Sequence, residues 1–251
     1  TALVRTPRLW PEDKPPMTAE HVESLLTWII LGVLIGGRVG FVLFYEPAYY
    51  LTHPAEILRI WEGGMSFHGG LAGVCAATLI FCARNAVPLW STADALAVAV
   101  GPGLFLGRIA NFINAELWGR PTTVPWGVVF PGEEAQSCPL DWIGPCARHP
   151  SQLYEALLEG LVLGGLLLWL AWRRGGLKRP GMLAGVFFAG YGLARFVVEF
   201  FRLADARFIT PDNPHGHVLG TGAAGITMGQ LLSLPMVAIG LWLIWRAGKR
   251  A

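Results

Sequence analysis

Long apolar runs, separated by polar and proline-rich stretches, dominate this chain. A helix needs about 20 mostly apolar residues to cross the hydrocarbon core of a bilayer. Six runs approach or reach that length, and they cover residues 22–45, 67–86, 91–109, 152–172, 182–201 and 228–245. Several contain many glycines, which suits the close packing of helices in lipid. The pattern predicts an all-α integral membrane protein with six transmembrane helices.

The composition supports a membrane environment. Of the 251 residues, 53% are hydrophobic and only 14% are charged, against roughly 25% charged residues in soluble domains. The mean hydropathy is +0.48. A soluble domain of this size could not bury so much apolar surface, so we expect the lipid bilayer to surround the protein. The net charge of +2 gives no reason to expect nucleic acid as a partner.

The basic residues orient the six predicted spans. Eleven fall on one side: Arg5, Arg8, Lys14, Arg84, Arg173, Arg174, Lys178, Arg179, Arg246, Lys249 and Arg250. The opposite side carries five: Arg59, Arg120, Arg148, Arg202 and Arg207. Loops rich in Lys and Arg stay in the cytoplasm. Both ends of the chain are therefore expected to be cytoplasmic.

The connections between the spans suggest the domain organisation. Residues 1–21 are expected to form a cytoplasmic N-terminal segment, and residues 22–251 a single transmembrane domain. An insertion at about 111–149 is expected to fold as a small periplasmic head. Cys138 and Cys146 lie in it and could form a disulfide in an oxidising compartment. The chain begins with Thr1, which we interpret as the truncated start of a longer protein.

Charged residues inside the spans need an explanation, because a charge near the bilayer centre costs several kcal/mol. Arg195 and Glu199 lie four residues apart in the fifth span, so they share one helix face, which Tyr191 extends by a turn. A pair that only neutralises two buried charges is one interpretation. A functional site is the other.

Another polar group follows the third span. Arg108 ends that span, and Asn111, Asn114 and Glu116 follow. Snorkelling of Arg108 to the membrane interface would explain the arginine. It would not explain why two asparagines and a glutamate accompany it.

Two further segments carry polar candidates. His68 is bracketed by glycines, which allow close approach of a backbone or a lipid headgroup. It could act as a general base near pH 7 or simply cap the second span. The segment HPSQLYE looks mainly like the start of the fourth span. Within it, Gln152, Tyr154 and Glu155 are expected to support a site by contacting the residues that bind the substrate.

Six stretches together resemble the bacterial prolipoprotein diacylglyceryl transferase family over nearly the whole chain. They are GGRVGFVLFY, WEGGMSFHGGLAG, GRIANFINAELWGRP, RHPSQLYEALLEG, GYGLARFVVEFFR and MGQLLS. The resemblance implies an inner-membrane, multi-pass transferase whose active site faces the periplasm. Family members usually have seven spans with an outer N-terminus, and the first span is missing here.

The resemblance also implies a reaction. The family transfers the diacylglyceryl group of phosphatidylglycerol to the lipobox cysteine in the signal peptide of a preprolipoprotein, and glycerol 1-phosphate is released. Positions regarded as essential or important in the family match these residues: His68, Arg108, Glu116, Arg195 and Glu199, with Asn111 and Gly119 in the same motif.

The candidate residues support a mechanism for that reaction. The nucleophile is a thiolate, and a free cysteine has a pKa of roughly 8.5, so a base such as His68 is needed. Arg108 and Arg195 would grip the phosphate. Glu199 would hold Arg195, and Glu116 with Asn111 would orient Arg108 or the glycerol hydroxyls. Further substrate contacts are expected from Asn114, Gly119, Tyr191 and Gln152. The scheme requires no metal and no cofactor.

Two alternatives compete with this interpretation. A lipid or anion transporter could use an arginine-lined headgroup site, although the chain lacks the internal repeat of many transporters. An intramembrane protease would need a nucleophile–base pair or two aspartates within spans. Asp94 is the only aspartate inside a predicted span.

Overall fold

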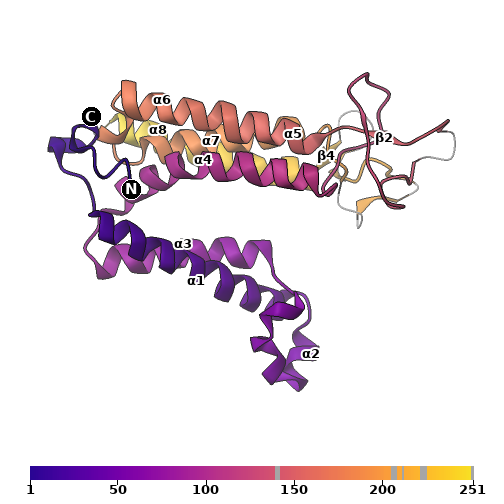
Figure 1. The fold of residues 1–251 in the computed structure, drawn as a ribbon, viewed down its shortest axis with the longest axis horizontal. Helices are drawn as coiled ribbons and strands as arrows, with labels where there is room; N and C mark the ends of the chain where they lie inside the picture. The colour runs from indigo at the N-terminus through magenta and orange to yellow at the C-terminus, as the bar shows by residue number, and fades with distance from the viewer. Residues whose placement is uncertain (139–141, 205–207, 211, 221–224, 250–251) are drawn as a thin grey trace. The chain divides into compact units, whose positions relative to one another are not determined.

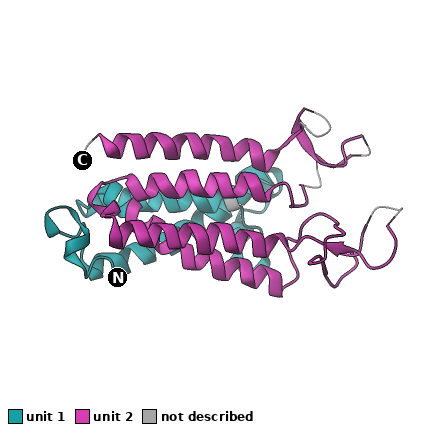
Figure 2. Ribbon diagram, turned by 90° about the horizontal axis from the view of Figure 1, so that it is seen from above, with its two compact units in different colours: residues 1–92 teal, residues 93–251 magenta. Residues whose placement is uncertain are grey.

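The computed structural model describes all 251 residues except 139–141, 205–207, 211, 221–224 and 250–251. The chain forms two compact units, Thr1–Thr92 and Ala93–Ala251 (Figure 2). Predicted residues Arg207 and Arg250 lie outside the described residues. Helices make up most of the structure, as expected for an all-α membrane protein (Figure 1).

Unit 1 is built on two antiparallel helices. Its elements are η1 (Pro7–Leu9), η2 (Pro11–Asp13), α1 (Ala19–Phe44), α2 (Pro47–Thr52), η3 (Pro54–Leu58), η4 (Ile60–Glu62) and α3 (Phe67–Arg84). Gly32 and Gly36, one turn apart on α1, face Gly73 of α3. A Cβ added to Gly32 would lie 2.6 Å from the Gly73 carbonyl oxygen. The two backbones therefore pack directly on each other, as small residues permit in lipid.

Arg38 organises the connection that follows α1. Its side chain donates to the backbone carbonyls of Glu56 (2.6 Å), Ile57 (2.8 Å), Gly63 (2.7 Å) and Gly64 (3.1 Å). Only 5% of Arg38 is exposed. This arginine, which lies within the first predicted span, ties the backbone carbonyls of the connection to α1 and so fixes its fold.

Unit 2 is a helix bundle with irregular connections at one end (Figure 1). Its helices are α4 (Leu89–Ile113, which begins at the end of unit 1), α5 (Ser151–Glu155), the π-helical segment η5 (Ala156–Val162), α6 (Leu163–Arg173), η6 (Gly176–Lys178), α7 (Met182–Val198) and α8 (Met228–Gly248). Gly185 of α7 packs on α8, where its Cβ would lie 2.9 Å from the Gly240 oxygen. The backbones of α7 and α8 are therefore in close contact at these glycines, as those of α1 and α3 are in unit 1.

Two small antiparallel sheets stabilise the connections of unit 2. Strand β1 (Val128–Val129) pairs with β2 (Ala147–Arg148), and β3 (His217–Leu219) pairs with β4 (Ile226–Thr227). The first sheet belongs to the expected head, where Cys138 and Cys146 form a disulfide. Arg148 is 2% exposed and donates to carbonyls of the head, including Ala135 (2.6 Å) and Ser137 (2.7 Å).

The helices lie where the apolar runs predict them, with differences at some ends. Among the described residues, four helices are long and apolar enough to cross a membrane: Ala19–Phe44, Leu89–Ile113, Ser151–Arg173 and Met228–Gly248. The second and fifth predicted spans correspond to shorter apolar helices, His68–Arg84 and Met182–Val198. α4 continues past residue 109, so Asn111 is helical. α7 ends before residue 201, because Phe201 instead accepts a hydrogen bond from the Arg120 backbone N–H at 2.9 Å.

Candidate functional site

Helical periodicity brings Arg195 and Glu199 together, as predicted. They lie one turn apart at the end of α7, and Arg195 Nη2 is 3.0 Å from Glu199 Oε2. The hydroxyl of Thr227, at the start of α8, donates to Glu199 Oε1 at 3.1 Å. Glu199 is thus anchored by α8 and fixes one edge of the Arg195 guanidinium.

Glu155 lies at the centre of the cluster that contains this pair. Arg195 Nη1 and Arg202 Nη1 each donate to Glu155 Oε1 at 2.7 Å. Arg108 Nε lies 3.1 Å from Glu155 Oε2. Guanidinium groups from α4, from α7 and from the segment after α7 therefore converge on one carboxylate. The sequence predicts only a supporting role for Glu155, whereas the structure places it between both predicted arginines.

The helix that begins at Ser151 explains how two carboxylates reach this point. Glu155 and Glu159 are four residues apart, so they face the same way, and neither side chain is exposed (0%). Glu159 belongs to the π-helical segment, a rare element that often occurs at functional sites. Gly160 lets this segment approach α4 closely, since its Cβ would lie 2.6 Å from the Phe105 Cα.

The formal charges of the cluster cancel, but the two signs occupy different layers. Its members are Arg108, Arg195 and Arg202 with Glu155, Glu159 and Glu199. The three arginine side chains are 19%, 22% and 17% exposed, while the glutamate side chains are 0%, 0% and 7% exposed. The carboxylates form a buried inner layer that holds the guanidinium groups. Each guanidinium has five N–H donors, and each arginine side chain stays partly exposed.

Several contacts inside the cluster are electrostatic without good hydrogen-bond geometry. Glu155 Oε2 and Glu199 Oε2 lie near arginine nitrogens, yet neither has a hydrogen-bond partner among the described residues. Both oxygens of Glu159 are in the same situation, and its nearest arginine nitrogen, Nη2 of Arg108, is 3.7 Å away. The guanidinium groups are therefore held in place without all their hydrogen-bond donors being used by these carboxylates.

Glu116 forms a second polar group beside the end of α4. Its Oε1 accepts from Asn111 Nδ2 at 2.7 Å and from Asn114 Nδ2 at 3.4 Å. Gln152, which is fully buried, donates to the Glu116 backbone oxygen at 2.6 Å. The sequence predicts that Glu116 and Asn111 orient either Arg108 or the glycerol hydroxyls, and among the described contacts they bond to each other rather than to Arg108. That arginine is instead held by the glutamates of the α5–η5 helix, because these face it across the close α4 contact.

The other predicted residues have diverse surroundings. The Tyr191 side chain lies close to the Arg108 guanidinium and interacts with it electrostatically. Gly119 donates its N–H to the His149 oxygen at 2.9 Å, and a Cβ there would collide with that oxygen and with the Phe201 oxygen. Gly119 therefore has a packing role in the structure. His68 lies in the first turn of α3, in unit 1, so its role as the base stays a prediction.

The sequence did not indicate Arg202 and Glu159 as members of the cluster, and it gave Glu155 a supporting role without its central place. One signal was present: Glu155 and Glu159 are separated by four residues, as are Arg195 and Glu199. Helical periodicity therefore predicts that the two residues of each pair lie on one face of their helix. Which pairs face each other depends on how separate helices pack, and a single sequence does not reveal that.

Comparison with known proteins gives a consistent result. The family model described as "Prolipoprotein diacylglyceryl transferase" matches residues 2–246. A protein of Ruegeria pomeroyi, named phosphatidylglycerol–prolipoprotein diacylglyceryl transferase, is 64% identical over 97% of this chain and 82% of its own length. Proteins with the same name from Cereibacter sphaeroides (60% identical; 99% of this chain, 85% of the relative) and Brucella anthropi (47%; 99% and 82%) are also similar.

Proposed function

Because the chain belongs to the prolipoprotein diacylglyceryl transferase family, we propose that its arginine–glutamate cluster is the active site of that transfer. The substrates are phosphatidylglycerol and the lipobox cysteine in the signal peptide of a preprolipoprotein. One observation carries the proposal: Arg108, Arg195 and Arg202 converge around Glu155, and their side chains stay partly exposed. Such a group suits an anionic phosphodiester.

The chemistry is a displacement at carbon. The cysteine sulfur forms a bond to a glyceryl carbon, and the bond from that carbon to the phosphate oxygen breaks. The electron pair of the broken bond leaves on that oxygen, which gives glycerol 1-phosphate. The thiol proton goes to a base. The arginines stabilise the negative charge that grows on the phosphate, and a preorganised site strengthens this effect.

The described contacts suggest how the work is divided. Arg108 and Arg195 bind the phosphate, and Arg202 adds a third positive charge beside them. Glu155 and Glu199 position these guanidinium groups from the buried layer. His68 is the proposed base.

Substrate-binding roles are proposed for residues around this centre. Tyr191 is close to Arg108 and would contact the headgroup. Glu116, with Asn111 and Asn114, would bind the glycerol hydroxyls, and Gln152 would hold Glu116 in place. The packing of Gly119 would support this loop.

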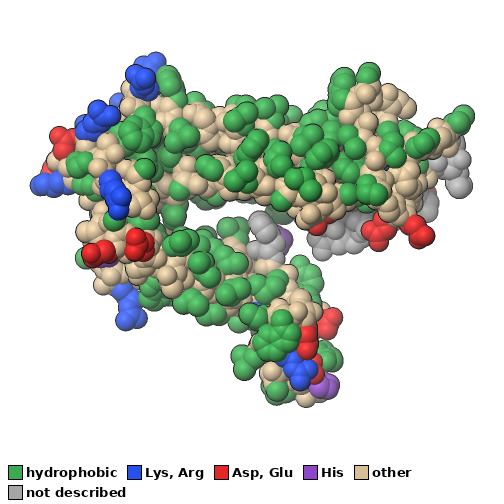
Figure 3. Space-filling model, viewed as in Figure 1, with side chains coloured by type: hydrophobic (Ala, Val, Ile, Leu, Met, Phe, Trp, Pro, Cys, Tyr) green, Lys and Arg blue, Asp and Glu red, His purple; other side chains and the backbone are tan. Residues whose placement is uncertain are grey.

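We also propose a membrane topology. Six helices cross the bacterial inner membrane, both ends of the chain are cytoplasmic, and residues 111–149 form a periplasmic head near the active site. Residues 22–251 then act as one transmembrane domain after a cytoplasmic segment, 1–21. Lys and Arg side chains gather at the end of the unit 2 bundle where α6 and α8 end (Figure 3), which supports a cytoplasmic location for that end. A disulfide in the head suits an oxidising periplasm.

The test is a transfer assay with purified protein in lipid nanodiscs. The assay supplies phosphatidylglycerol and a lipobox peptide and follows the gain of one diacylglyceryl mass on cysteine. A peptide with serine in place of that cysteine is the control and should gain no mass. Arg195→Ala should abolish the gain. If His68→Gln kept near-normal turnover, the base would have to be another residue.

The transporter alternative makes a different prediction, and membership of a transferase family does not favour it. A transporter would move phosphatidylglycerol headgroups across liposomes without forming a thioether. Headgroup movement with no peptide modification would contradict the proposed function.

A further inference from the structure

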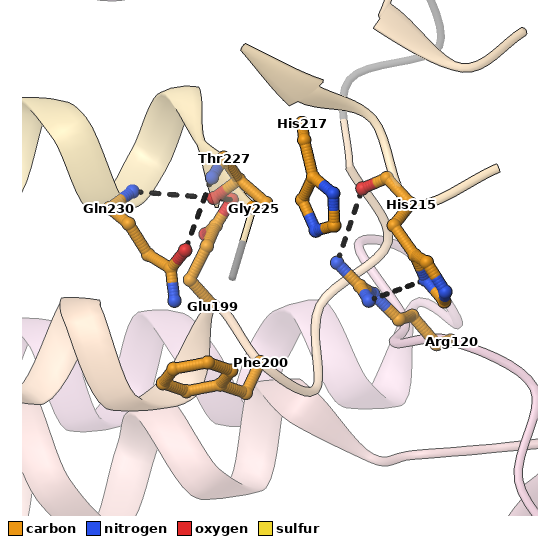
Figure 4. Close-up of a pocket in the computed structure, with 8 residues that line it drawn as sticks. All are labelled: Arg120, Glu199, Phe200, His215, His217, Gly225, Thr227 and Gln230. Carbon is orange, nitrogen blue, oxygen red and sulfur yellow. Dashed lines mark hydrogen bonds between the residues drawn. The ribbon is translucent and has the colours of Figure 1, made fainter. Parts of the chain in front are cut away.

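A cavity of about 350 Å³ adjoins the cluster through Glu199, near the end of α7 and the start of α8 (Figure 4). Its volume is at the lower end of the range for ligand pockets, roughly 300–1,000 Å³, so it suits a small molecule. Its lining residues are Arg120, Glu199, Phe200, His215, His217, Gly225, Thr227 and Gln230.

One side of the cavity is lined by the nitrogen-bearing side chains of Arg120, His215 and His217. Arg120 Nη1 lies 3.2 Å from His215 Nδ1, and Arg120 Nη2 donates to the His215 oxygen at 3.4 Å. The rings of His215 and His217 stack with centroids 5.5 Å apart. In Figure 4 the His217 ring lies between Arg120 and the opposite wall. Arg120 also donates from Nε to the Arg202 oxygen at 2.7 Å, which fixes its position.

The opposite wall carries buried acceptors. Glu199, Thr227 and Gln230 are 5%, 3% and 2% exposed. Glu199 Oε2 has no hydrogen-bond partner among the described residues and lies 3.0 Å from Arg195 Nη2. Because Glu199 also pairs with Arg195, the cavity adjoins the proposed reaction centre.

We propose that this cavity is a subsite for the released product, a small polyol phosphate. The phosphate faces Arg120, His215 and His217, and the hydroxyl groups face Glu199 and Gln230. This inference rests on the proposed function, which supplies glycerol 1-phosphate as a product. A phosphate monoester carries about −1.5 to −2 charges at pH 7, whereas the diester of a lipid headgroup carries one. The group of one arginine and two histidines suits the more highly charged monoester.

The electrostatics of His217 agree with an anion site. Burial, together with the neighbouring His215 and Arg120, lowers the pKa of His217 below its ordinary value. His217 is therefore mostly neutral at pH 7. A bound phosphate would favour its protonated form and gain a charge-assisted hydrogen bond.

The experiment measures binding of glycerol 1-phosphate to the purified full chain by titration calorimetry. The pair of substitutions His215→Gln and His217→Gln should raise the Kd at least about tenfold, which is the loss of 1.4 kcal/mol expected for a charge-assisted contact. Replacing the double variant by His215→Gln with His217→Arg should restore affinity for glycerol 1-phosphate, since arginine returns a cationic donor to position 217. A fold defect would not be rescued in this way, and unfolding midpoints of all variants are measured in parallel.

A matched control substitutes two histidines in unit 1, His21→Gln with His53→Gln. Glutamine at residue 21 can still complete the capping box with Thr18, so this variant should bind like the parent. Inorganic phosphate should compete with glycerol 1-phosphate, and glycerol should not.

Two further binding measurements distinguish whether the cavity binds the headgroup of the lipid or the released product. Phosphatidylglycerol in nanodiscs tests the lipid headgroup, and glycerol 1-phosphate tests the product. The product assignment fails if the parent shows no saturable binding of glycerol 1-phosphate. It also fails if the cavity substitutions leave that Kd unchanged, or if they weaken only the lipid. Transfer activity of the parent, measured without added product, reports separately on the proposed function.

Discussion

The head and the helix cluster of unit 2 both contain arginines with few contacts to solvent, but the partners of these arginines differ. Arg148 in the head donates to backbone carbonyls and lies 4.2 Å from the Trp118 ring centroid. Arg108 and Arg195 in the cluster face the carboxylate of Glu155. When an arginine donates to several backbone carbonyls of one loop, these hydrogen bonds fix the conformation of that loop. A carboxylate behind a partly exposed guanidinium instead orients it for a ligand.

Arg38 in unit 1 belongs with Arg148, because its contacts are also carbonyls. The distinction therefore separates arginines that determine local folding from arginines placed for chemistry. Burial follows the same division, since Arg38 and Arg148 are 5% and 2% exposed, whereas the side chains of Arg108 and Arg195 are 19% and 22% exposed.

The largest expected effect comes from Arg195→Gln. The substitution removes a guanidinium from the proposed phosphate site while Arg108 and Arg202 still face Glu155. We expect the rate of transfer to fall by at least about 100-fold, as when one preorganised charge stabiliser is lost. The mass-gain assay measures it. A rate within tenfold of the parent would place Arg195 with the structural arginines.

A smaller loss is expected for Glu155→Gln. The amide keeps the shape of the side chain but removes the negative charge that holds three guanidinium groups. We expect the transfer rate to fall roughly 10- to 100-fold, because charge-assisted contacts are about twice as strong as neutral ones. Glu133→Gln, an exposed glutamate of the head, is the matched control. Equal rates for both variants would contradict the positioning role of Glu155.

Arg148→Gln tests the other side of the comparison. It should lower the free energy of unfolding by about 2–3 kcal/mol, since buried hydrogen bonds from a charged donor are lost. The transfer rate per folded molecule should stay within about twofold of the parent. Denaturant unfolding in detergent and the mass-gain assay measure the two quantities. Arg59→Gln, which removes exposed ion pairs, should cost at most about 1 kcal/mol.

The smallest expected effect is a pH dependence of the head. Burial lowers the pKa of His149 below its ordinary value of 6.5. The unfolded chain therefore binds more protons at this residue than the folded chain, and stability from it is lost as the pH falls through 6.5 towards the folded pKa. His149→Gln should reduce the difference in unfolding midpoint between pH 7.5 and pH 5.5. If His149→Gln left the difference in unfolding midpoint unchanged, other groups would cause the pH dependence.

Much of this protein could be predicted from local patterns. The apolar runs locate the long helices, and a spacing of four residues correctly predicts that Arg195 contacts Glu199. Helical periodicity acts within one turn, so one sequence is enough to determine such pairs. The family motifs also identify the chemistry, because they join particular residue types at particular spacings.

The tertiary structure decided which helices share a charge cluster. Glu155 meets Arg195 across 40 residues and Arg202 across 47, and the close approach of Gly160 to Phe105 brings α4 to the same place. These contacts depend on the packing of separate helices, on a π-helical segment and on where α7 ends. None has a local signature, because the free energy that selects them comes from surfaces far apart along the chain.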